Sequence, residues 1–177
     1  MNDTPNHFTI GRAVEADVGA LTEFGARTFY ESFIADNTEE DMAKHLASAW
    51  QPDLQRGEIL DPTIDTLLAR DSRGALAGFA QVRDKIAPEG IDTLQPIELW
   101  RFYVDQPWQG RGLARALMEA VFECARARGG RDLWLGVFER NDRARAFYRK
   151  CGFEKVGDKI FVVGTDPQRD HVMMRRL

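Results

Sequence analysis

Two glycines and two arginines lie together in the segment QPWQGRGLARAL, residues 106–117. The segment follows the apolar run IELWRFYV, which is typical of a strand, and it continues into residues that favour a helix. Glycine lets backbone N–H groups approach a bound group closely, and a helix N-terminus carries partial positive charge. Arg111 and Arg115 add full positive charges. The pattern therefore predicts a site for a phosphate-bearing ligand.

Two familiar phosphate-binding motifs fit this segment poorly. A P-loop needs Gly-Lys-Ser/Thr, whereas Gly112 is followed here by Leu113 and Ala114. A dinucleotide-binding GxGxxG turn needs a third glycine for close helix packing, and Arg115 stands at that position. Asp132 falls about 20 residues further on, as in a dinucleotide fold, but it precedes the next strand instead of ending it.

A second pair of polar residues lies in NDRARAFYRKCGF, residues 141–153. Asn141 is a residue type that caps helix N-termini. Tyr148 comes two helical turns later, so both side chains can face one groove. The Tyr148 hydroxyl can donate a proton, and the alternative is a core aromatic residue.

Glu98 is a carboxylate inside the strand of residues 97–104. With a period of two it is expected to share a face with Trp100, Phe102 and Val104. A charge among large apolar neighbours is costly unless it is used or paired. Two interpretations are open: a catalytic base, acting directly or through a water, or a salt bridge or exposed strand end.

A mixed α/β fold must position these side chains. Apolar periodicity predicts antiparallel strands first and a β-α-β-α-β unit afterwards, in one domain that spans residues 1–177. Strands are expected at residues 8–13, 65–70, 75–84, 97–104, 132–138, 153–163 and 169–177. Helices are expected at residues 15–33, 37–50, 111–128 and 141–151, with a short one at 52–60.

The two motifs, in this order, resemble the acetyl-CoA-binding motifs of the GNAT superfamily of N-acetyltransferases. The matching segments are QGRGLA, residues 109–114, and residues 141–153. Longer stretches such as FGARTFYESFIADNTEEDM and VGTDPQRDHVMMRRL are similar to the bacterial spermidine/spermine N-acetyltransferases. The resemblance implies the GNAT fold, a mostly antiparallel seven-stranded sheet splayed between two parallel strands and flanked by about four helices.

The resemblance also implies acetyl-CoA as cofactor, bound where the strands of residues 97–104 and 133–138 splay apart. Backbone groups near Phe102 and Val104 are expected to pair with the pantetheine arm, and Asn141 to bond it. The diphosphate is expected at Gln109, Gly110, Arg111, Gly112, Leu113, Ala114 and Arg115.

The implied reaction is direct transfer of acetyl from the thioester to a primary amine. The amine must be neutral, although free alkyl amines have a pKa of about 10.4. The resemblance gives Tyr148 the role of general acid at sulfur and Glu98 the role of base. The alternative acceptors are a protein N-terminus, a lysine or an amine antibiotic. A further alternative is a CoA-binding regulator without turnover.

Charge is unevenly distributed along the chain. Residues 1–100 carry 18 acidic and 8 basic side chains, whereas residues 101–150 carry 6 acidic and 11 basic ones. The asymmetry favours a cationic acceptor, a small polyamine, on the first part and an anionic ligand on the second. Phe29, Tyr30 and Phe33 are expected to wall the acceptor site. The alternative is that they form the core face of the first helix.

No metal site, nucleic-acid surface or membrane span is expected. Histidines and cysteines lack metal-ligand spacing, and no basic stripe with interleaved aromatics is present. No apolar run approaches the roughly 18 residues that cross a bilayer. The first residues lack the pattern of a signal peptide, so a cytoplasmic location is expected. The final strands suggest an intermolecular edge contact, and hence a homodimer.

Overall fold

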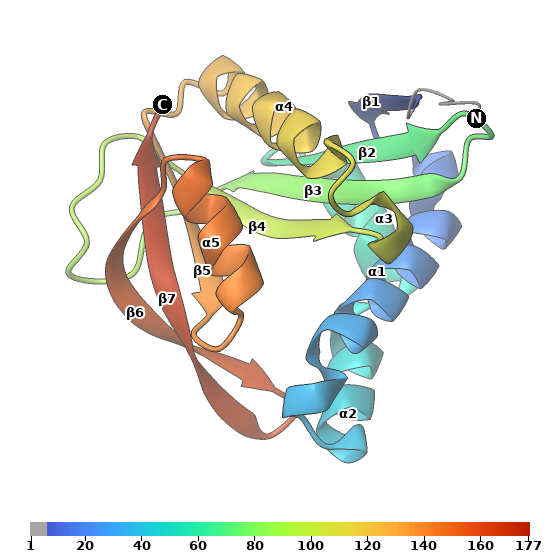
Figure 1. Cartoon of the computed structure of the whole chain (residues 1–177), viewed down its shortest axis with the longest axis horizontal. Helices are drawn as coiled ribbons and strands as arrows, with labels where there is room; N and C mark the ends of the chain where they lie inside the picture. Colours follow the sequence, from blue (N-terminus) through green and yellow to red (C-terminus); the bar gives the residue numbers. More distant parts are fainter. Residues whose placement is uncertain (1–6) are drawn as a thin grey trace.

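The computed structural model describes residues 7–177 (Figure 1). Seven strands form one sheet in the order β1-β2-β3-β4-β5-β7-β6. Neighbouring strands are antiparallel except for β4 and β5, which are parallel. The expected mostly antiparallel sheet with one parallel pair is confirmed. Residues 1–6, part of the segment considered for a signal peptide, lie outside the described residues.

The element bounds agree closely with the sequence periodicity. The strands are β1 (Phe8–Arg12), β2 (Ile64–Asp71), β3 (Leu76–Asp84), β4 (Pro96–Val104), β5 (Asp132–Phe138), β6 (Glu154–Val163) and β7 (Asp166–Arg176). The helices are α1 (Val18–Phe33), α2 (Glu39–Ala49), α3 (Pro52–Leu60), α4 (Leu113–Ala127) and α5 (Asp142–Lys150). Among these helices of residues 7–177, none has the length and apolarity that a bilayer crossing requires.

Local signals explain most of these bounds. The Thr38 hydroxyl accepts the backbone N–H of Asp41 at 3.1 Å and so caps α2. Gly129, with φ of 80°, follows the end of α4. β7 begins at Asp166, three residues before the expected position, because its ladder with β6 continues up to the turn that contains Gly164.

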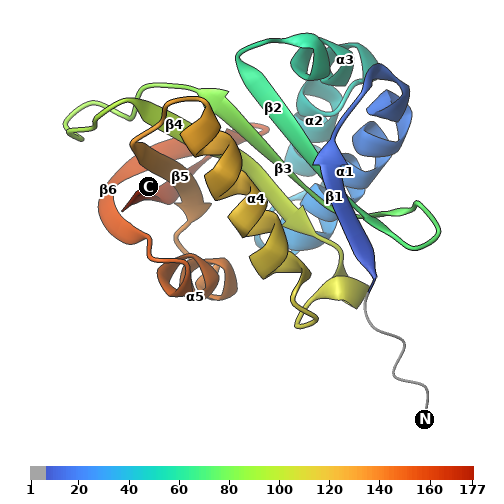
Figure 2. The ribbon, with the colours of Figure 1, turned by 90° about the horizontal axis from the view of Figure 1, so that it is seen from above.

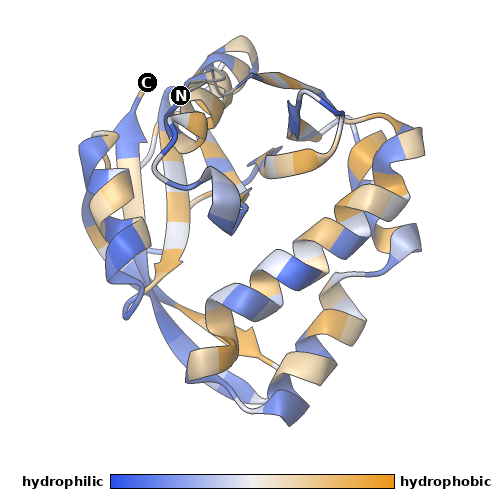
Figure 3. Cartoon of the chain, turned by 45° about the vertical axis from the view of Figure 1, so that its right-hand side comes forward, coloured by the Kyte–Doolittle hydropathy of each residue, from blue (hydrophilic) through white to orange (hydrophobic). Residues whose placement is uncertain are grey.

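Helices cover both faces of the sheet. α4 and α5 pack on one face, and α1, α2 and α3 pack on the other (Figures 1 and 2). Hydrophobic and hydrophilic residues alternate along the helices (Figure 3), a pattern typical of helices that bury one side. The cofactor is expected on the face under α4 and α5, which is therefore called the cofactor face below, and the face under α1 and α2 is called the acceptor face, after the amine expected there.

β4 contains a bulge that the sequence pattern did not reveal. Gln81 on β3 pairs with Arg101, but its neighbour Val82 pairs with Leu99. Trp100 is therefore an extra residue on β4, without a partner in the ladder with β3. An extra residue shifts the alternation of side chains between the two faces by one position.

The bulge overturns the expectation that Glu98 shares a face with Phe102 and Val104. Phe102 and Val104 pack into the apolar cluster under α4 and α5, on the cofactor face. Tyr103 packs into the cluster under α1 and α2. Glu98 lies on this second side, where its carboxylate meets Lys159 of β6.

β6 forms one edge of the sheet. It carries three exposed apolar side chains, Val156, Ile160 and Val162. The homodimer contact through the final strands stays a prediction.

Candidate active site

β4 and β5 pair only at their N-terminal ends. Within these two strands, both fully described, the ladder consists of Pro96 with Asp132, Ile97 with Leu133 and Glu98 with Trp134. Beyond Glu98 and Trp134 the two strands separate. The remaining backbone of β4 therefore faces a gap, where an extended group can bind as an added strand would.

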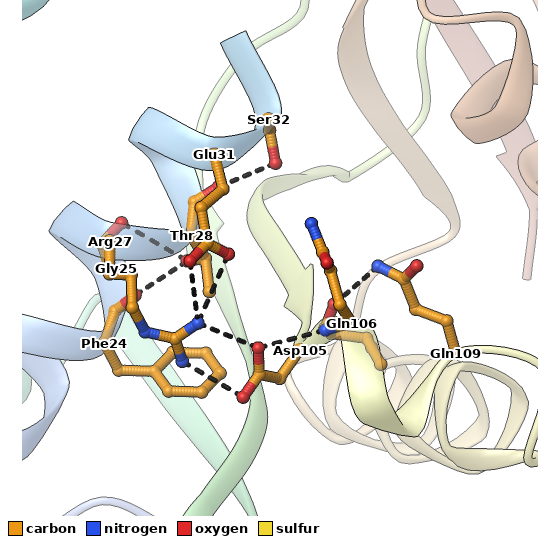
Figure 4. Close-up of polar contacts among 10 residues, drawn as sticks. Phe24, Gly25, Arg27, Thr28, Glu31, Ser32, Asp105, Gln106 and Gln109 are labelled. Atoms are coloured by element: carbon orange, nitrogen blue, oxygen red, sulfur yellow. Dashed lines mark hydrogen bonds and ion pairs between the residues drawn. The ribbon is translucent and has the colours of Figure 1, made fainter. Parts of the chain in front are cut away.

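The backbone groups of Phe102 and Val104 face this gap. The N–H of Asp105 donates to the carbonyl of Ala77 on β3 at 2.9 Å. Backbone groups alternate in direction along an antiparallel strand, so the N–H groups of Phe102 and Val104 point away from β3. The side-chain amide of Gln109 donates to the Val104 carbonyl at 3.1 Å (Figure 4).

The loop from β4 to α4 contains two glycines in the left-handed region. Gly110 has φ of 76° and Gly112 has φ of 86°. A Cβ built at either position meets no heavy atom within 4 Å, so the space in front of the loop is open. Gly112 is also the N-cap of α4, and the first N–H groups of the helix lack intrahelical acceptors. This geometry fits a diphosphate.

The residues of the first turn of α4 have different surroundings. The Leu113 side chain is fully buried and anchors the turn, so only its backbone N–H faces the loop. Ala114 is partly buried. Arg111 and Arg115 are exposed and bring positive charge to the N-terminus of the helix.

An ion pair ties this loop to α1. The carboxylate of Asp105 accepts from both Nη atoms of Arg27, at 2.9 and 3.0 Å (Figure 4). One Asp105 oxygen also accepts the N–H of Gln106 at 3.0 Å, and Glu31 holds the same guanidinium at 3.2 Å. Such a bidentate pair fixes direction as well as distance. Sequence reasoning missed it, because Arg27 and Asp105 are 78 positions apart.

Tyr148 lies on α5 with its side chain 8% exposed. Its ring is edge-on to Phe102 at 6.3 Å and also contacts Phe147 and Phe153. Burial raises the pKa of the Tyr148 hydroxyl, and nearby Tyr103 adds to the rise. The hydroxyl is therefore protonated at physiological pH. No hydrogen bond of this hydroxyl is found within residues 7–177.

Asn141 caps the helix that carries Tyr148. Its side-chain oxygen accepts the N–H of Ala144 at 3.0 Å, so the capping interpretation is confirmed. The cap uses the oxygen and leaves the amide nitrogen of Asn141 for another partner.

Glu98 is 2% exposed and is held by two cations. One carboxylate oxygen accepts from Nε of Arg83 at 2.5 Å, and the other lies 3.9 Å from Nζ of Lys159. The Arg83 guanidinium also lies over the ring of Trp100, 3.7 Å from its centroid. The salt-bridge interpretation of Glu98 is confirmed, whereas its use as a base stays a prediction.

Comparison with a family model decides the family. Residues 26–153, most of the chain, match the model described as the acetyltransferase (GNAT) family. This chain belongs to the GNAT family.

Individual relatives agree with this result. An uncharacterised N-acetyltransferase of Lactobacillus delbrueckii subsp. lactis is 33% identical over 165 residues, 92% of this chain and 94% of that protein. The aminoglycoside N(6')-acetyltransferase type 1 of Stenotrophomonas maltophilia is 31% identical over 156 residues, 86% and 90% of the two chains. The GNAT chain described here is thus an acetyl-CoA-dependent N-acetyltransferase.

A solved structure shows the same fold. The crystal structure of the PaiA N-acetyltransferase from Thermoplasma acidophilum in complex with coenzyme A superposes with a TM-score of 0.80. The sequences are 19% identical, and the match covers 97% of this chain and 99% of that one.

The three aromatic residues expected to wall the acceptor site of this GNAT enzyme have different surroundings. Phe29 is 4% exposed and stacks on His45 of α2 at 4.2 Å, so it is a core residue between two helices. The Tyr30 hydroxyl donates to Glu39 at 2.8 Å. Phe33 lies edge-on to Phe138 at 6.4 Å, at the end of β5. Of the three, Phe33 is the one whose ring contacts β5.

The acidic side chains around the α1–α2 connection have partners close by. Asp41 accepts from the backbone N–H and the hydroxyl of Thr165 at 2.7 and 2.8 Å. Ion pairs also join Asp36 to Arg140 at 3.3 Å and Glu40 to Lys44 at 2.6 Å. The negative charge of this region is therefore partly neutralised.

Three polar residues on the acceptor face of the GNAT sheet were missed by sequence reasoning: Tyr103, Lys159 and Asp170. Lys159 on β6 stands directly opposite Asp170 on β7, and Asp170 stands opposite Phe138 on β5. Asp170 is 7% exposed, and burial raises its pKa to about 6 against the opposing effect of Lys159. For Lys159 and Asp170 the sequence signal is a charged residue at an inward-facing strand position, which can be recognised only when the register of the strands is known.

Proposed function

We propose that this N-acetyltransferase modifies a small cationic amine, a polyamine in first place, with Tyr148 as the general acid. The separation of β4 and β5 beyond Glu98 and Trp134 carries the proposal, because it opens the sheet between a phosphate cradle and an acceptor face. Tyr148 borders this gap through its contact with Phe102. The same architecture serves acetyl transfer to other amines, so the acceptor needs separate support.

Bound acetyl-CoA supplies an acyl group activated as a thioester. In the proposal the segment 109–115 holds its diphosphate through backbone N–H groups and through the charges of Arg111 and Arg115. Backbone groups of Phe102 and Val104 hold the arm, together with the free amide nitrogen of Asn141. A backbone N–H of this strand segment polarises the acyl carbonyl oxygen.

Proton transfer is the chemistry that side chains must provide. An amine bound as its ammonium form has no lone pair for attack, so one proton must first leave it. Tyr148 supplies a proton to the departing sulfur, and the raised pKa keeps the hydroxyl protonated for this role. Both oxygens of Glu98 face cations, so a base role for Glu98 requires a relayed water.

A cationic acceptor is supported by the excess of acidic side chains in residues 1–100 and by the buried carboxylate of Asp170 on the acceptor face. An amine antibiotic is the second candidate, favoured by the 31% identical relative whose name specifies an aminoglycoside. A protein N-terminus or lysine is the third. Polyamines are proposed first because residues 24–42 and 163–177 resemble, by their sequence pattern, spermidine/spermine N-acetyltransferases.

The experiment measures thiol release from acetyl-CoA with a panel of amines at pH 7.5. The panel comprises spermidine, spermine, an aminoglycoside, an N-terminal peptide, glycine and glutamate. We expect the highest kcat/KM for the polyamines and a KM that rises with salt as charge attraction is screened. A preference for glutamate or a salt-insensitive KM contradicts the polyamine proposal. Tight CoA binding, with no thiol released from acetyl-CoA in the presence of any amine, favours the alternative of a CoA-binding regulator.

A further inference from the structure

We propose that Asp170 on β7 is the carboxylate that binds the ammonium group of the acceptor and takes one of its protons. The inference rests on the proposed function, in that the acceptor is an amine, but it does not depend on which amine is used.

Asp170 differs from the other buried carboxylates of residues 7–177. Asp65 pairs with Arg12 and Arg128, Glu98 pairs with Arg83, and Asp132 accepts from Leu94 and Arg176. Asp170 is 7% exposed, and within the described residues its carboxylate makes neither a hydrogen bond nor an ion pair. A buried charge without a partner is costly, so its presence calls for a ligand that supplies the partner.

The position of Asp170 fits an acceptor site. One of its oxygens lies 3.0 Å from the point where a Cβ at Gly136 of β5 would stand, and Nζ of Lys159 lies 2.7 Å from the same point. The missing side chain of Gly136 therefore makes room for both groups above β5. Phe138 and Phe33 form an apolar border beside them. The site thus combines a carboxylate, which can pair with an ammonium group, with two aromatic side chains that can pack against the alkyl part of an amine.

Few charged groups face Asp170 from the neighbouring elements. From β6, Lys159 acts to lower its pKa, and Lys159 in turn faces Glu98 on β4. From β4, Tyr103 lies near enough that Asp170 adds to the rise of the Tyr103 pKa, which burial dominates and Arg101 opposes. Gly136 and Phe138 of β5 and Phe33 of α1 bring no charge.

Tyr103 and Tyr148 pack in the apolar clusters on opposite faces of the sheet. Burial raises the pKa of both hydroxyls, Tyr103 adds to the rise at Tyr148, and Asp170 adds to the rise at Tyr103. The proposed proton acceptor, Asp170, and the proposed proton donor, Tyr148, thus lie on opposite faces of the sheet.

The proton step balances without any other reactant. An N–H bond of the ammonium group breaks, its electron pair stays on nitrogen as the lone pair, and the proton forms an O–H bond with Asp170. Asp170 returns to the carboxylate by losing this proton to water before the next acceptor binds. A carboxylate whose pKa is about 6 is a stronger base than an ordinary one, and it is still mostly ionised at pH 7.5.

The test replaces Asp170 by asparagine, which keeps the size and removes the charge. Asp158→Asn is the matched control: it is on β6, its side chain is 43% exposed, and its partner is Lys155. We measure kcat/KM between pH 5 and 9 with the amine that the wild type uses best. Asp170→Asn should lose 10²- to 10⁴-fold in kcat/KM and the rise of activity around pH 6, while Asp158→Asn keeps both. The Kd for CoA should stay unchanged in both variants.

Glu98→Gln is the competing variant. If Asp170→Asn keeps the wild-type pH profile of kcat/KM while Glu98→Gln loses the acidic limb, which is the rise of kcat/KM around pH 6, then Glu98 is the base. The proposal for Asp170 is then overturned. If the wild type does not acetylate polyamines but acetylates a peptide or an antibiotic, the polyamine proposal is wrong and the inference about Asp170 is not affected. Loss of that activity in Asp170→Asn then still supports the inference.

A second experiment uses only the wild-type protein, so its result depends neither on turnover nor on whether a variant folds. ¹³C-labelled aspartate is observed by NMR between pH 4 and 8, with and without spermidine at saturating concentration, and likewise with any better acceptor. One carboxyl should titrate near pH 6, and its midpoint should fall when the ammonium group binds beside it. The proposal is overturned if no aspartate carboxyl titrates near pH 6. It is also overturned if the carboxyl that titrates there keeps its midpoint when the amine is added.

Discussion

Lys159 reaches from β6 toward Glu98 on β4, with 3.9 Å between its Nζ and a carboxylate oxygen. It does so although Asp170, not Glu98, stands opposite it in the β6–β7 ladder. Its side chain passes over Gly136, where a Cβ would collide with it. Lys159 therefore pairs with Glu98, and it lowers the pKa of Asp170 without forming an ion pair with it.

The position of Lys159 predicts the direction of a pH shift. In Lys159→Met the charge that lowers the pKa of Asp170 is gone, so this pKa should rise above about 6. The acidic limb of the pH profile of kcat/KM should move to higher pH. Lys155→Met, on the same strand with its side chain 45% exposed, is the control and should leave the limb in place. A limb that moves to lower pH contradicts this account.

Asp170→Asn should stabilise the protein while it lowers activity. The folded pKa of about 6 lies above the ordinary aspartate value of about 3.9, so ionisation of Asp170 opposes folding. The cost is fully present above pH 6 and disappears as the pH falls toward 4. We expect the variant to gain up to about 3 kcal/mol in the free energy of unfolding at pH 8, and almost nothing at pH 4.

Urea denaturation at pH 4, 6 and 8 measures this difference. Asp132→Asn is the contrasting variant, because Asp132 is fully buried and accepts from the Leu94 N–H at 2.7 Å and from Arg176 at 3.2 Å. Its loss should destabilise the fold by about 1–3 kcal/mol at pH 8. A destabilised Asp170→Asn protein at pH 8 would mean that Asp170 has a structural role.

Gly112→Glu should abolish binding of acetyl-CoA. The new side chain would enter the open space before the loop and place a negative charge where the diphosphate is expected. Gly129→Glu is a close control, because Gly129 has φ of 80°, faces open space and lies at the other end of α4. Both variants carry a left-handed non-glycine residue, at a cost of about 1–2 kcal/mol. Calorimetry should show lost affinity only for Gly112→Glu.

Tyr148→Phe should lower kcat by 10²- to 10⁴-fold and leave the Kd for acetyl-CoA nearly unchanged. The ring still packs against Phe102 and Phe153, and only the proton donor is removed. Single-turnover rates should be measured beside steady-state rates, so that a slow product-release step does not hide the effect. Wild-type single-turnover rates across the pH range would identify Tyr148 as a core residue.

Local chemistry made much of this fold and of its cofactor side predictable. Apolar periodicity located the strands and helices, and Asn141 was predicted as a helix cap. The glycines of residues 109–114 predicted the open loop before α4. Each of these signals depends on residues within a few positions of one another, because caps and turns are local hydrogen-bonded structures.

The acceptor side was decided by the tertiary structure. The extra residue Trp100 put Glu98 and Phe102 on opposite faces, and a bulge shows only when β4 is paired with β3. Asp170 became a candidate when the strand order set it beside Lys159 and above Gly136. Residue types and spacing determine which elements form and which side chains can do chemistry. Which face and which partners those side chains receive depends on register and strand order, and these are set by contacts between distant segments.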